Sequence, residues 1–502
     1  MPSRKSMRLI SVIILAIGVF ALMACNKTGT ATQTASAATN DGKVPITTQS
    51  EEARKEFLQG RDFAEKLRAQ DSVAHFDKAI SLDPNFAAAE LARANSAPTA
   101  KDFFEHLNRA VLLADKVSEG EKLLILANEA GANGQVTKQK EYLDRLVAIY
   151  PNDERVRFNL GGYHFAQQEY EQAIAHYKKA TELAPDYSPA YNILGYSYRQ
   201  QGNYPAAEQA FKKYIELIPN DPNPYDSYAE LLLKMGRFED SIVQYKKALS
   251  MDEHFVPSYF GMSADLMYLG KPNEATADLQ AMISKARNDG ELRTAYFGLA
   301  VASVDNGKLA QGVKYMDSEY AVAEKKNDVA AMAADLQAKG NIIAEMQRYD
   351  EAQQQFDKSL ELIQTSGLSQ FIKDNAQLLH HFNLTAIAIL KKDYASAKSH
   401  AQEYRAGAEA SKNPGQIKLA HELAGRIALA EKDYDAAITE LEQANDQDPR
   451  NLYRLSLAFQ AKGNGDKARE YCLKAAQFNS LPALNYSFIR AKAQKAAAAK
   501  KA

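Results

Sequence analysis

A repeat of 34 residues constrains this chain more than any other feature of its sequence. Three residue classes keep that spacing in phase through the first half. They are the prolines Pro151, Pro185 and Pro219, the small residues Ala173, Ala207, Ser241 and Ala275, and the large residues Tyr177, Phe211, Tyr245 and Leu279. Stacked supersecondary units produce such a period, whereas independent globular domains do not. The chain is therefore predicted to be a repeat array, and not the three domains that 502 residues would otherwise indicate.

Each unit is predicted to consist of two helices. In residues 154–187, small and large residues recur at helical spacing on both sides of a polar turn. Pro185 ends the second helix, because proline cannot continue a helix interior. Gly202 and Gly236 stand at the corresponding turns, where a left-handed residue often ends a helix. This pattern predicts an all-α protein.

These units resemble tetratricopeptide repeats. The unit that starts at Ser188 matches the family pattern at Tyr191, Leu194, Gly195, Ala207, Phe211 and Pro219. The unit from Ala53 matches it at Gly60, Ser72, Phe76, Ala79 and Pro84. The resemblance implies a right-handed superhelical solenoid of helical hairpins. Such solenoids bind protein or peptide partners on an extended concave face.

The repeat divides the chain into segments. A solenoid is predicted for residues 51–288, with regular repeats at 154–288. In residues 289–480 the period lengthens and varies, which predicts divergent hairpins with longer helices or turns. Residues 481–502 are rich in Ala and Lys with few apolar anchors, and a fraying helix or a tail is expected there.

The N-terminus predicts export. Basic residues precede an apolar run, Leu9 to Ala24, that is short of the about 20 residues of a spanning helix. The run ends Leu22-Met23-Ala24-Cys25, which resembles a bacterial lipobox and implies acylation of Cys25. Residues 1–25 are then a lipoprotein signal peptide. An uncleaved signal anchor, or a plain signal peptide with a chance cysteine, remains the alternative.

The residues after Cys25 predict where the protein lies. Residues 26–50 hold no apolar stripe, so a disordered tether is expected. Asn26 follows the cysteine where Asp would imply retention at the inner membrane, so the resemblance favours an outer membrane with the protein facing the periplasm. The cell surface is the alternative location.

Nothing in the sequence predicts an enzyme, a cofactor or a metal site. His421-Glu422 lacks the second His of a zinc-protease helix, because Gly425 stands there. His380 and His381 are adjacent and point to different helix faces. A catalytic site hidden in the irregular stretches 87–150 or 290–420 is the remaining alternative.

Composition limits the partners and the redox chemistry. A net charge of −2 gives no global attraction to nucleic acid, which is not expected as a partner. Two cysteines are too few for a disulfide framework, and Cys472 is expected to be a small buried apolar residue. The sequence leaves the oligomeric state open.

The resemblance also implies a partner-binding face. Carried onto this chain, the family's concave positions include Arg155, Phe158, Asn192, Tyr196, Arg199 and Phe260. Aromatic side chains beside Arg and Asn could hold an extended peptide by stacking and backbone hydrogen bonds. Packing between repeats is the alternative role for Phe158 and Phe260.

The predicted function is thus a membrane-tethered scaffold that binds protein or peptide partners in the cell envelope. Assembly, secretion or export would be its setting. A glycan- or peptide-binding lipoprotein that serves a transport system is the alternative.

Overall fold

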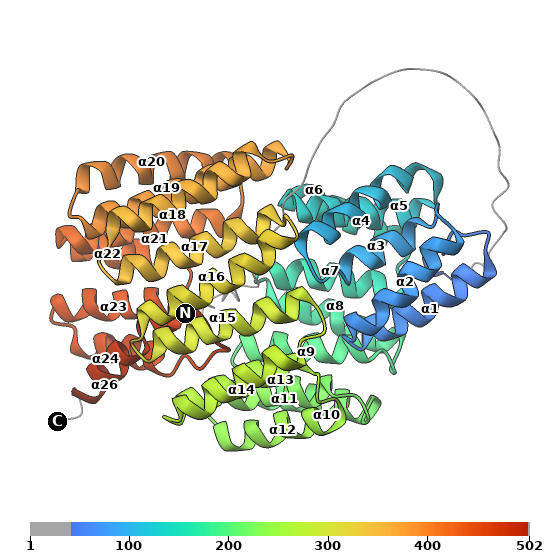
Figure 1. The fold of residues 1–502 in the computed structure, drawn as a ribbon, viewed down its shortest axis with the longest axis horizontal. Helices are drawn as coiled ribbons and strands as arrows, with labels where there is room; N and C mark the ends of the chain where they lie inside the picture. Colours follow the sequence, from blue (N-terminus) through green and yellow to red (C-terminus); the bar gives the residue numbers. More distant parts are fainter. Residues whose placement is uncertain (1–41, 500–502) are drawn as a thin grey trace, which may run out of the picture.

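The computed structural model describes residues 42–499, and in that range the chain forms helices and no strands (Figure 1). A short 3-10 turn, Ala114–Lys116, joins α4 to α5. The helices are α1 (Glu51–Glu65), α2 (Ala69–Leu82), α3 (Ala87–Asn95), α4 (Ala100–Leu113), α5 (Glu119–Ala132), α6 (Val136–Ile149), α7 (Glu154–Ala166), α8 (Tyr170–Leu183), α9 (Ser188–Gln200), α10 (Tyr204–Leu217), α11 (Asn223–Lys234), α12 (Phe238–Met251), α13 (Val256–Tyr268), α14 (Pro272–Lys285), α15 (Asp289–Asp305), α16 (Leu309–Lys325), α17 (Val329–Glu345), α18 (Tyr349–Thr365), α19 (Gln370–Leu390), α20 (Tyr394–Ser411), α21 (Pro414–Glu431), α22 (Tyr434–Leu441), α23 (Pro449–Ala461), α24 (Gly465–Ala476), α25 (Leu484–Ser487) and α26 (Arg490–Ala499).

Consecutive helices pair as hairpins, and each hairpin packs on the next in a right-handed superhelical solenoid, as the sequence predicts. The small residues stand where the two helices of a hairpin come closest. Ala173 and Ala207 have no exposed surface. Gly161 and Gly195 lie against the aromatic rings of Tyr177 and Phe211 in the second helix of the pair. Short side chains are required there because the helix axes approach to about 8–10 Å.

The turns inside the hairpins also follow the prediction. Gly202 and Gly236 adopt positive φ angles of 74° and 76°. Other hairpins place a non-glycine residue at the same point of the turn, among them Gln168 with φ 65° and Lys432 with φ 68°. The left-handed turn geometry therefore recurs in hairpin after hairpin, whereas the residue type at that position varies.

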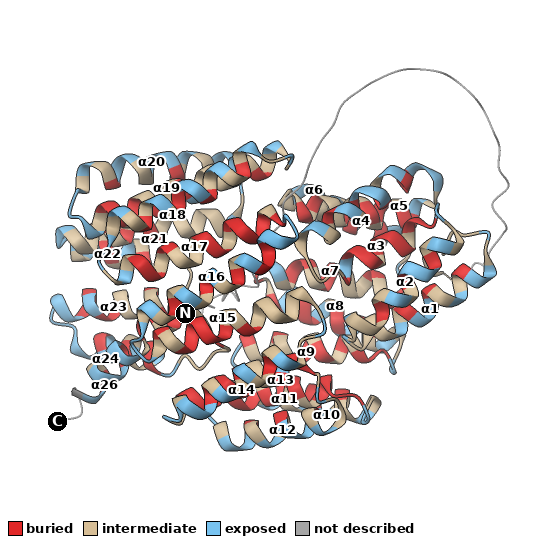
Figure 2. Ribbon diagram, viewed as in Figure 1, coloured by how far each residue is buried: buried red, intermediate tan, exposed pale blue. Residues whose placement is uncertain are grey.

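The second half of the chain contains the longer helices that its irregular period predicts. Helices α7 to α10 have 13 or 14 residues, whereas α15 to α18 have 17 each and α19 has 21. These longer helices also bury apolar residues, among them Leu299, Ile342 and Phe356, and buried positions are found on helices in both halves of the chain (Figure 2).

The superhelix turns far enough for its second turn to rest on its first. Helix α17 contacts α4, and one hydrophobic cluster joins α3–α5 to α17–α19. Polar contacts follow the same boundary. Asn288 donates to Gln70 at 2.8 Å, Ser369 donates to Asn133 at 3.3 Å, and Lys418 donates to Gln168 at 2.6 Å. Segments some 220 to 250 residues apart therefore lie side by side.

The C-terminal residues differ from the predicted tail. Helix α26 packs on α24, and Ala493 has no exposed surface. Tyr486 is buried and donates to the carbonyl of Ala476 at 2.9 Å. The Ala residues that looked like weak anchors suit this contact, because small side chains allow close helix packing. Cys472 is fully buried beside α26, as predicted.

Several sequence predictions fall on residues that are not described. The signal peptide 1–25, the acylated Cys25, and residues 26–41 of the tether lie outside the described range, as do residues 500–502. Within that range, no helix combines the length and the apolar character needed to cross a membrane.

Candidate functional site: a cavity in the first superhelical turn

A short non-helical stretch before α1 packs against the ends of several helices. Residues 43–48, called here the resident segment, cross the N-terminal ends of α7 and α5 before the chain enters α1. The backbone N–H of Val44 donates to Asp153 Oδ2 at 2.8 Å, and that of Thr47 donates to Glu121 Oε1 at 2.8 Å. The disorder predicted for residues 26–50 therefore does not extend through these residues.

The side chains of the resident segment make their own contacts. Lys43 pairs with Glu154 and donates to the carbonyl of Asn152 at 3.0 Å. Val44 packs on the core between α5, α6 and α7, and Ile46 packs on the aromatic core of the first hairpins. The Thr48 hydroxyl donates to Asp83 at 2.6 Å.

Beside the resident segment is a cavity of about 830 Å³, called here the first-turn cavity. Its size falls within the range of ordinary ligand pockets. Its walls come mainly from the first helices of successive hairpins, α1, α3, α5, α7 and α9, together with Ala69 and Phe76 of α2 and residues 43–46. Lining side chains include Arg61, Glu65, Glu121, Asp153, Glu154, Arg155, Phe158, Asn159, Tyr187 and Asn192.

Three of the six predicted binding residues meet at this cavity. Arg155 forms a two-point ion pair with Glu65, at 2.6 and 3.0 Å, and lies over the ring of Tyr187. Phe158 contacts the rings of Tyr177 and Tyr187, so it packs between repeats and lines the cavity as well. Both side chains line the first-turn cavity.

Asn192 is the third, and it contributes a buried polar wall. Its side chain is 2% exposed and reaches Asn223 at 3.5 Å through Nδ2. Its Oδ1 atom is buried and has no hydrogen-bond partner within the described residues. Asn192 therefore contributes a buried polar side chain to this wall of the cavity.

Tyr196 and Arg199 lie one turn further along α9, away from the cavity lining. The Arg199 guanidinium lies over the Tyr196 ring at 4.6 Å and pairs with Glu230 of α11 at 3.1 Å. Burial raises the pKa of Tyr196 well above its ordinary value. These two residues are tied to each other and to the next hairpin, so a role in packing accounts for their contacts.

Phe260 also packs inside the protein. It is partly buried in the hydrophobic cluster of α11 to α15, where it lies close to Gly298. The structure thus places Phe260 in the packing between repeats, which the sequence left open as its alternative role.

Acidic and basic side chains that line the first-turn cavity form ion pairs with one another. Burial acts to raise the pKa of Glu154, but the hydrogen bond from Lys43 and the charge of Arg155 leave it below its ordinary value. Arg61 has a long contact with Glu65, at 3.9 Å, and lies over the Phe57 ring at 5.7 Å. Burial, together with the charge of Arg155, lowers the pKa of Arg61.

Sequence reasoning missed the acidic side of the site. Asp153 is the N-cap of α7 and accepts the N–H groups of Arg155 and Val156 with Oδ1. Glu121 forms a capping box with Ser118 at the start of α5. Both residues serve as capping residues at helix N-termini. Their second role appears only when the resident segment is brought beside them.

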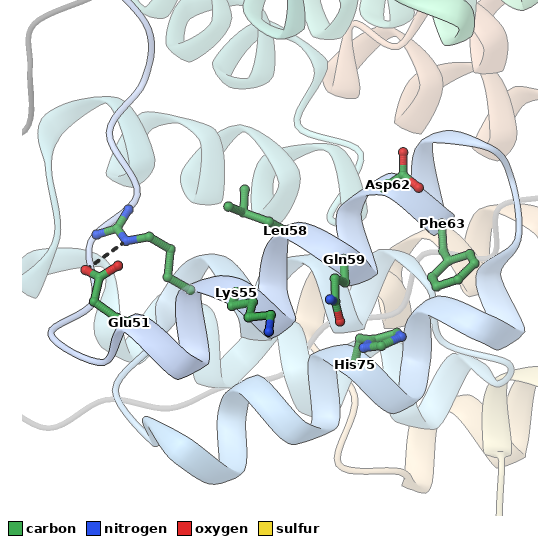
Figure 3. A pocket seen from close by; sticks show the side chains of 8 residues that line it. Glu51, Lys55, Leu58, Gln59, Asp62, Phe63 and His75 are labelled. Atoms are coloured by element: carbon green, nitrogen blue, oxygen red, sulfur yellow. Dashed lines mark ion pairs between the residues drawn. The ribbon is translucent and has the colours of Figure 1, made fainter.

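A second hollow lies on the outer surface of the first hairpin (Figure 3). It has a volume of about 740 Å³ and is formed by α1 and α2. Phe63 stacks on His75 there at 5.5 Å, and Glu51 pairs with Arg54 at 3.5 Å. His75 also contacts Glu56 of α1 at 2.7 Å, so these groups of the hollow are paired within the first hairpin.

The histidines considered for chemistry have structural partners. His421 contacts Glu440 at 2.6 Å, and its neighbour Glu422 is buried against Arg454 at 3.0 Å. His380 is buried, while His381 faces His400 at 3.3 Å. Among the described residues, no group of three or more His, Cys, Asp or Glu side chains is arranged to hold a metal ion.

Comparison with known proteins identifies the repeats in both halves. A family model described as tetratricopeptide repeat matches residues 126–188, 163–222 and 422–482, and a second model of that description matches 223–255. The chain is 30% identical over 111 residues to mouse (Mus musculus) Superkiller complex protein 3, an alignment that covers 22% of this chain and 7% of that protein. It is 28% identical over 169 residues to the Hsp70-Hsp90 organizing protein of Triticum aestivum, covering 33% of this chain and 28% of the relative.

Solved structures of repeat proteins also align with the chain. A tetratricopeptide repeat protein from Parabacteroides merdae aligns over 57% of this chain and 99% of its own, at 14% identity and a TM-score of 0.35. The alignments to the two curated relatives span less than a third of those proteins. The tetratricopeptide repeat models therefore match residues 126–255 and 422–482 of this chain.

Proposed function

We propose that this chain is a membrane-tethered scaffold that binds protein or peptide partners in a bacterial cell envelope, with the first-turn cavity as its binding site. One observation carries the binding part of the proposal. Asp153 and Glu121, which line the first-turn cavity, already bind a non-helical stretch of polypeptide through the backbone N–H groups of Val44 and Thr47. A surface that fits one extended backbone can accept another, because main-chain hydrogen bonds do not depend on the sequence.

The cavity supports the proposal by its shape and its chemistry. It is lined by Tyr187 and Asn192 as well as by residues 43–46, so a bound chain could contact side chains that the resident segment does not contact. Aromatic and Arg side chains line the cavity, and such residues dominate the energetics of protein interfaces. The concave face of a solenoid is also its usual binding surface.

Photo-crosslinking from inside the cavity tests the binding site. A photoreactive amino acid at Asn159, which lines the cavity, should capture discrete envelope proteins in living cells. The matched control is Val243 on the outer helix α12, where the side chain is 61% exposed. Identical captures from the two positions, or none from Asn159, would contradict the proposed site.

The tether is proposed from the lipobox-like sequence, and its setting is an outer membrane facing the periplasm. Multiple acyl chains on Cys25 would give stable anchoring that one chain cannot. Cys25→Ala should therefore release the protein into the soluble fraction. The matched control, Cys472→Ala, changes a buried cysteine and should leave the protein on membranes. A Cys25→Ala protein that still sediments with membranes after a high-salt wash would refute the anchor.

A further inference from the structure

We infer that the resident segment is an internal ligand of the peptide site, and that a partner binds by displacing it with a segment of the same pattern. The pattern is a basic residue, an apolar–Pro–apolar triplet, and two hydroxyl residues, as in Lys43 to Thr48. This inference rests on the proposed function and names the chemistry of the partner: an extended, basic-led peptide.

Two carboxylates recognise the backbone of the segment, and both are held in place beforehand. Asp153 caps α7 with one oxygen and accepts the N–H of Val44 with the other. Glu121 is held by its capping box with Ser118 and accepts the N–H of Thr47. Because each acceptor is already oriented by a helix cap, binding loses little side-chain freedom. The site is thus built to receive an extended chain.

The position of Pro45, between the hydrogen-bonded residues Val44 and Thr47, explains why a proline is suitable there. Pro45 has no backbone N–H to satisfy, and its fixed φ favours the extended conformation of the segment. Val44 and Ile46 flank it at a spacing of two, which places both side chains on the same side of an extended chain. Val44 enters the cluster of Leu123 and Val156, and Ile46 enters that of Phe57. These contacts select an apolar–Pro–apolar triplet.

Charge selects the residue before that triplet. Glu121, Asp153 and Glu154 are each at most 5% exposed and lie beside the segment. Glu154 pairs with Lys43 on one oxygen and with Arg155 on the other. Leaving a buried carboxylate without its ion-pair partner strongly destabilises the structure that contains it. An acidic residue in place of Lys43 would also repel Glu154. The site therefore favours a peptide that begins with Lys or Arg.

The segment is held loosely enough to leave. Each residue from 42 to 50 keeps some exposed surface, and none belongs to a helix. Its tether to α1 gives it an effective concentration in the millimolar range, so it blocks weak ligands. A partner that also fills the first-turn cavity, next to Asn192 and Tyr187, makes contacts that the resident segment does not make. Those added contacts are what allow a partner to displace it.

Competition in the full-length chain tests the inference. The probe is a fluorescent peptide with the sequence of residues 42–50, and its binding is followed by anisotropy. A Val44→Asp/Ile46→Asp variant weakens the resident segment, and Gln49→Asp is the matched control because Gln49 is exposed. The probe should bind the double variant at least tenfold more tightly than it binds the wild type or the control. Equal affinities for all three proteins would overturn the inference.

Changes in the probe test its pattern without changing the protein. A peptide in which Lys43 is replaced by Glu should bind the double variant at least tenfold more weakly than the original probe does; unchanged binding would overturn the pattern. In the wild type, hydrogen exchange at residues 43–48 should speed up when excess unlabelled peptide is added, and an unchanged rate would contradict displacement. If the probe fails in these tests while Asn159 still captures envelope partners, the inference fails and the proposed function stands.

Discussion

Replacing two neighbouring glycines of α7 by alanine should have opposite effects on stability. A Cβ atom on Gly161 would lie 2.8 Å from Cε1 of Tyr177, far inside ordinary carbon contact. The Tyr177 ring is 1% exposed and packed against Phe158, so it has little room to move. A Cβ on Gly162 would meet only the Tyr177 hydroxyl, at 3.8 Å.

The expected magnitudes follow from these distances. A Gly→Ala substitution inside a helix stabilises the folded protein by about 1 kcal/mol through helix propensity, and this contribution applies to both substitutions. Overpacking of a close contact destabilises by about 1–3 kcal/mol, and only Gly161→Ala has this loss. Gly162→Ala should therefore raise the free energy of unfolding by up to about 1 kcal/mol. Gly161→Ala should be less stable than Gly162→Ala by about 1–3 kcal/mol.

Equilibrium urea unfolding, followed by far-UV circular dichroism, measures this difference. The comparison between the two variants removes the shared helix propensity and leaves the steric contribution. Each transition midpoint is compared with the wild type together with the slope of the transition, because repeat proteins need not unfold in two states. A Gly161→Ala protein as stable as Gly162→Ala would refute the claim that hairpin packing depends on the missing Cβ.

Two further predictions concern pH and turn geometry. Burial raises the pKa of Asp265 to about 8, so the folded state holds a proton that the unfolded state releases, and stability should fall between about pH 4 and pH 8. Asp265→Asn should remove this loss of stability. Measured by thermal or urea unfolding, the free energy of unfolding of the variant relative to the wild type should rise by up to about 1.4 kcal/mol per pH unit between about pH 5 and 8. A difference that does not change with pH would contradict the burial argument. Lys432→Gly should stabilise the protein by about 0.5–1 kcal/mol, because φ is 68° at this position. Gly202→Ala should destabilise the protein by a similar amount: φ is 74° there, and an added Cβ would meet no other atom. Equal urea midpoints for these two variants would show that turn strain does not matter.

The hairpin can be read from the amino-acid sequence alone. Small residues such as Ala173 and Gly195, the facing ring of Phe211, and the left-handed Gly202 all act within one unit of 34 residues. These contacts join residues close in sequence, so a periodic pattern is sufficient to encode them. The same reasoning correctly predicted longer helices in the second half.

Part of the candidate site could be predicted for the same reason. The concave positions Arg155, Phe158 and Asn192 follow from their place within a repeat, and they meet at the first-turn cavity. Tyr196 and Phe260 occupy related positions, but neighbouring helices bury them in packing contacts. Position within a repeat decides which face a side chain takes, and the neighbouring hairpin decides whether that face stays open.

The ends of the chain and the meeting of the superhelical turns depend on the packed helices. The pairing of Lys418 with Gln168, and the packing of α26 on α24, involve residues that no repeat pattern links. The same holds for the resident segment, which reads as polar linker until Asp153 and Glu121 are placed beside it. Small rotations between hairpins add up along the superhelix, so contacts between distant residues depend on the whole stack.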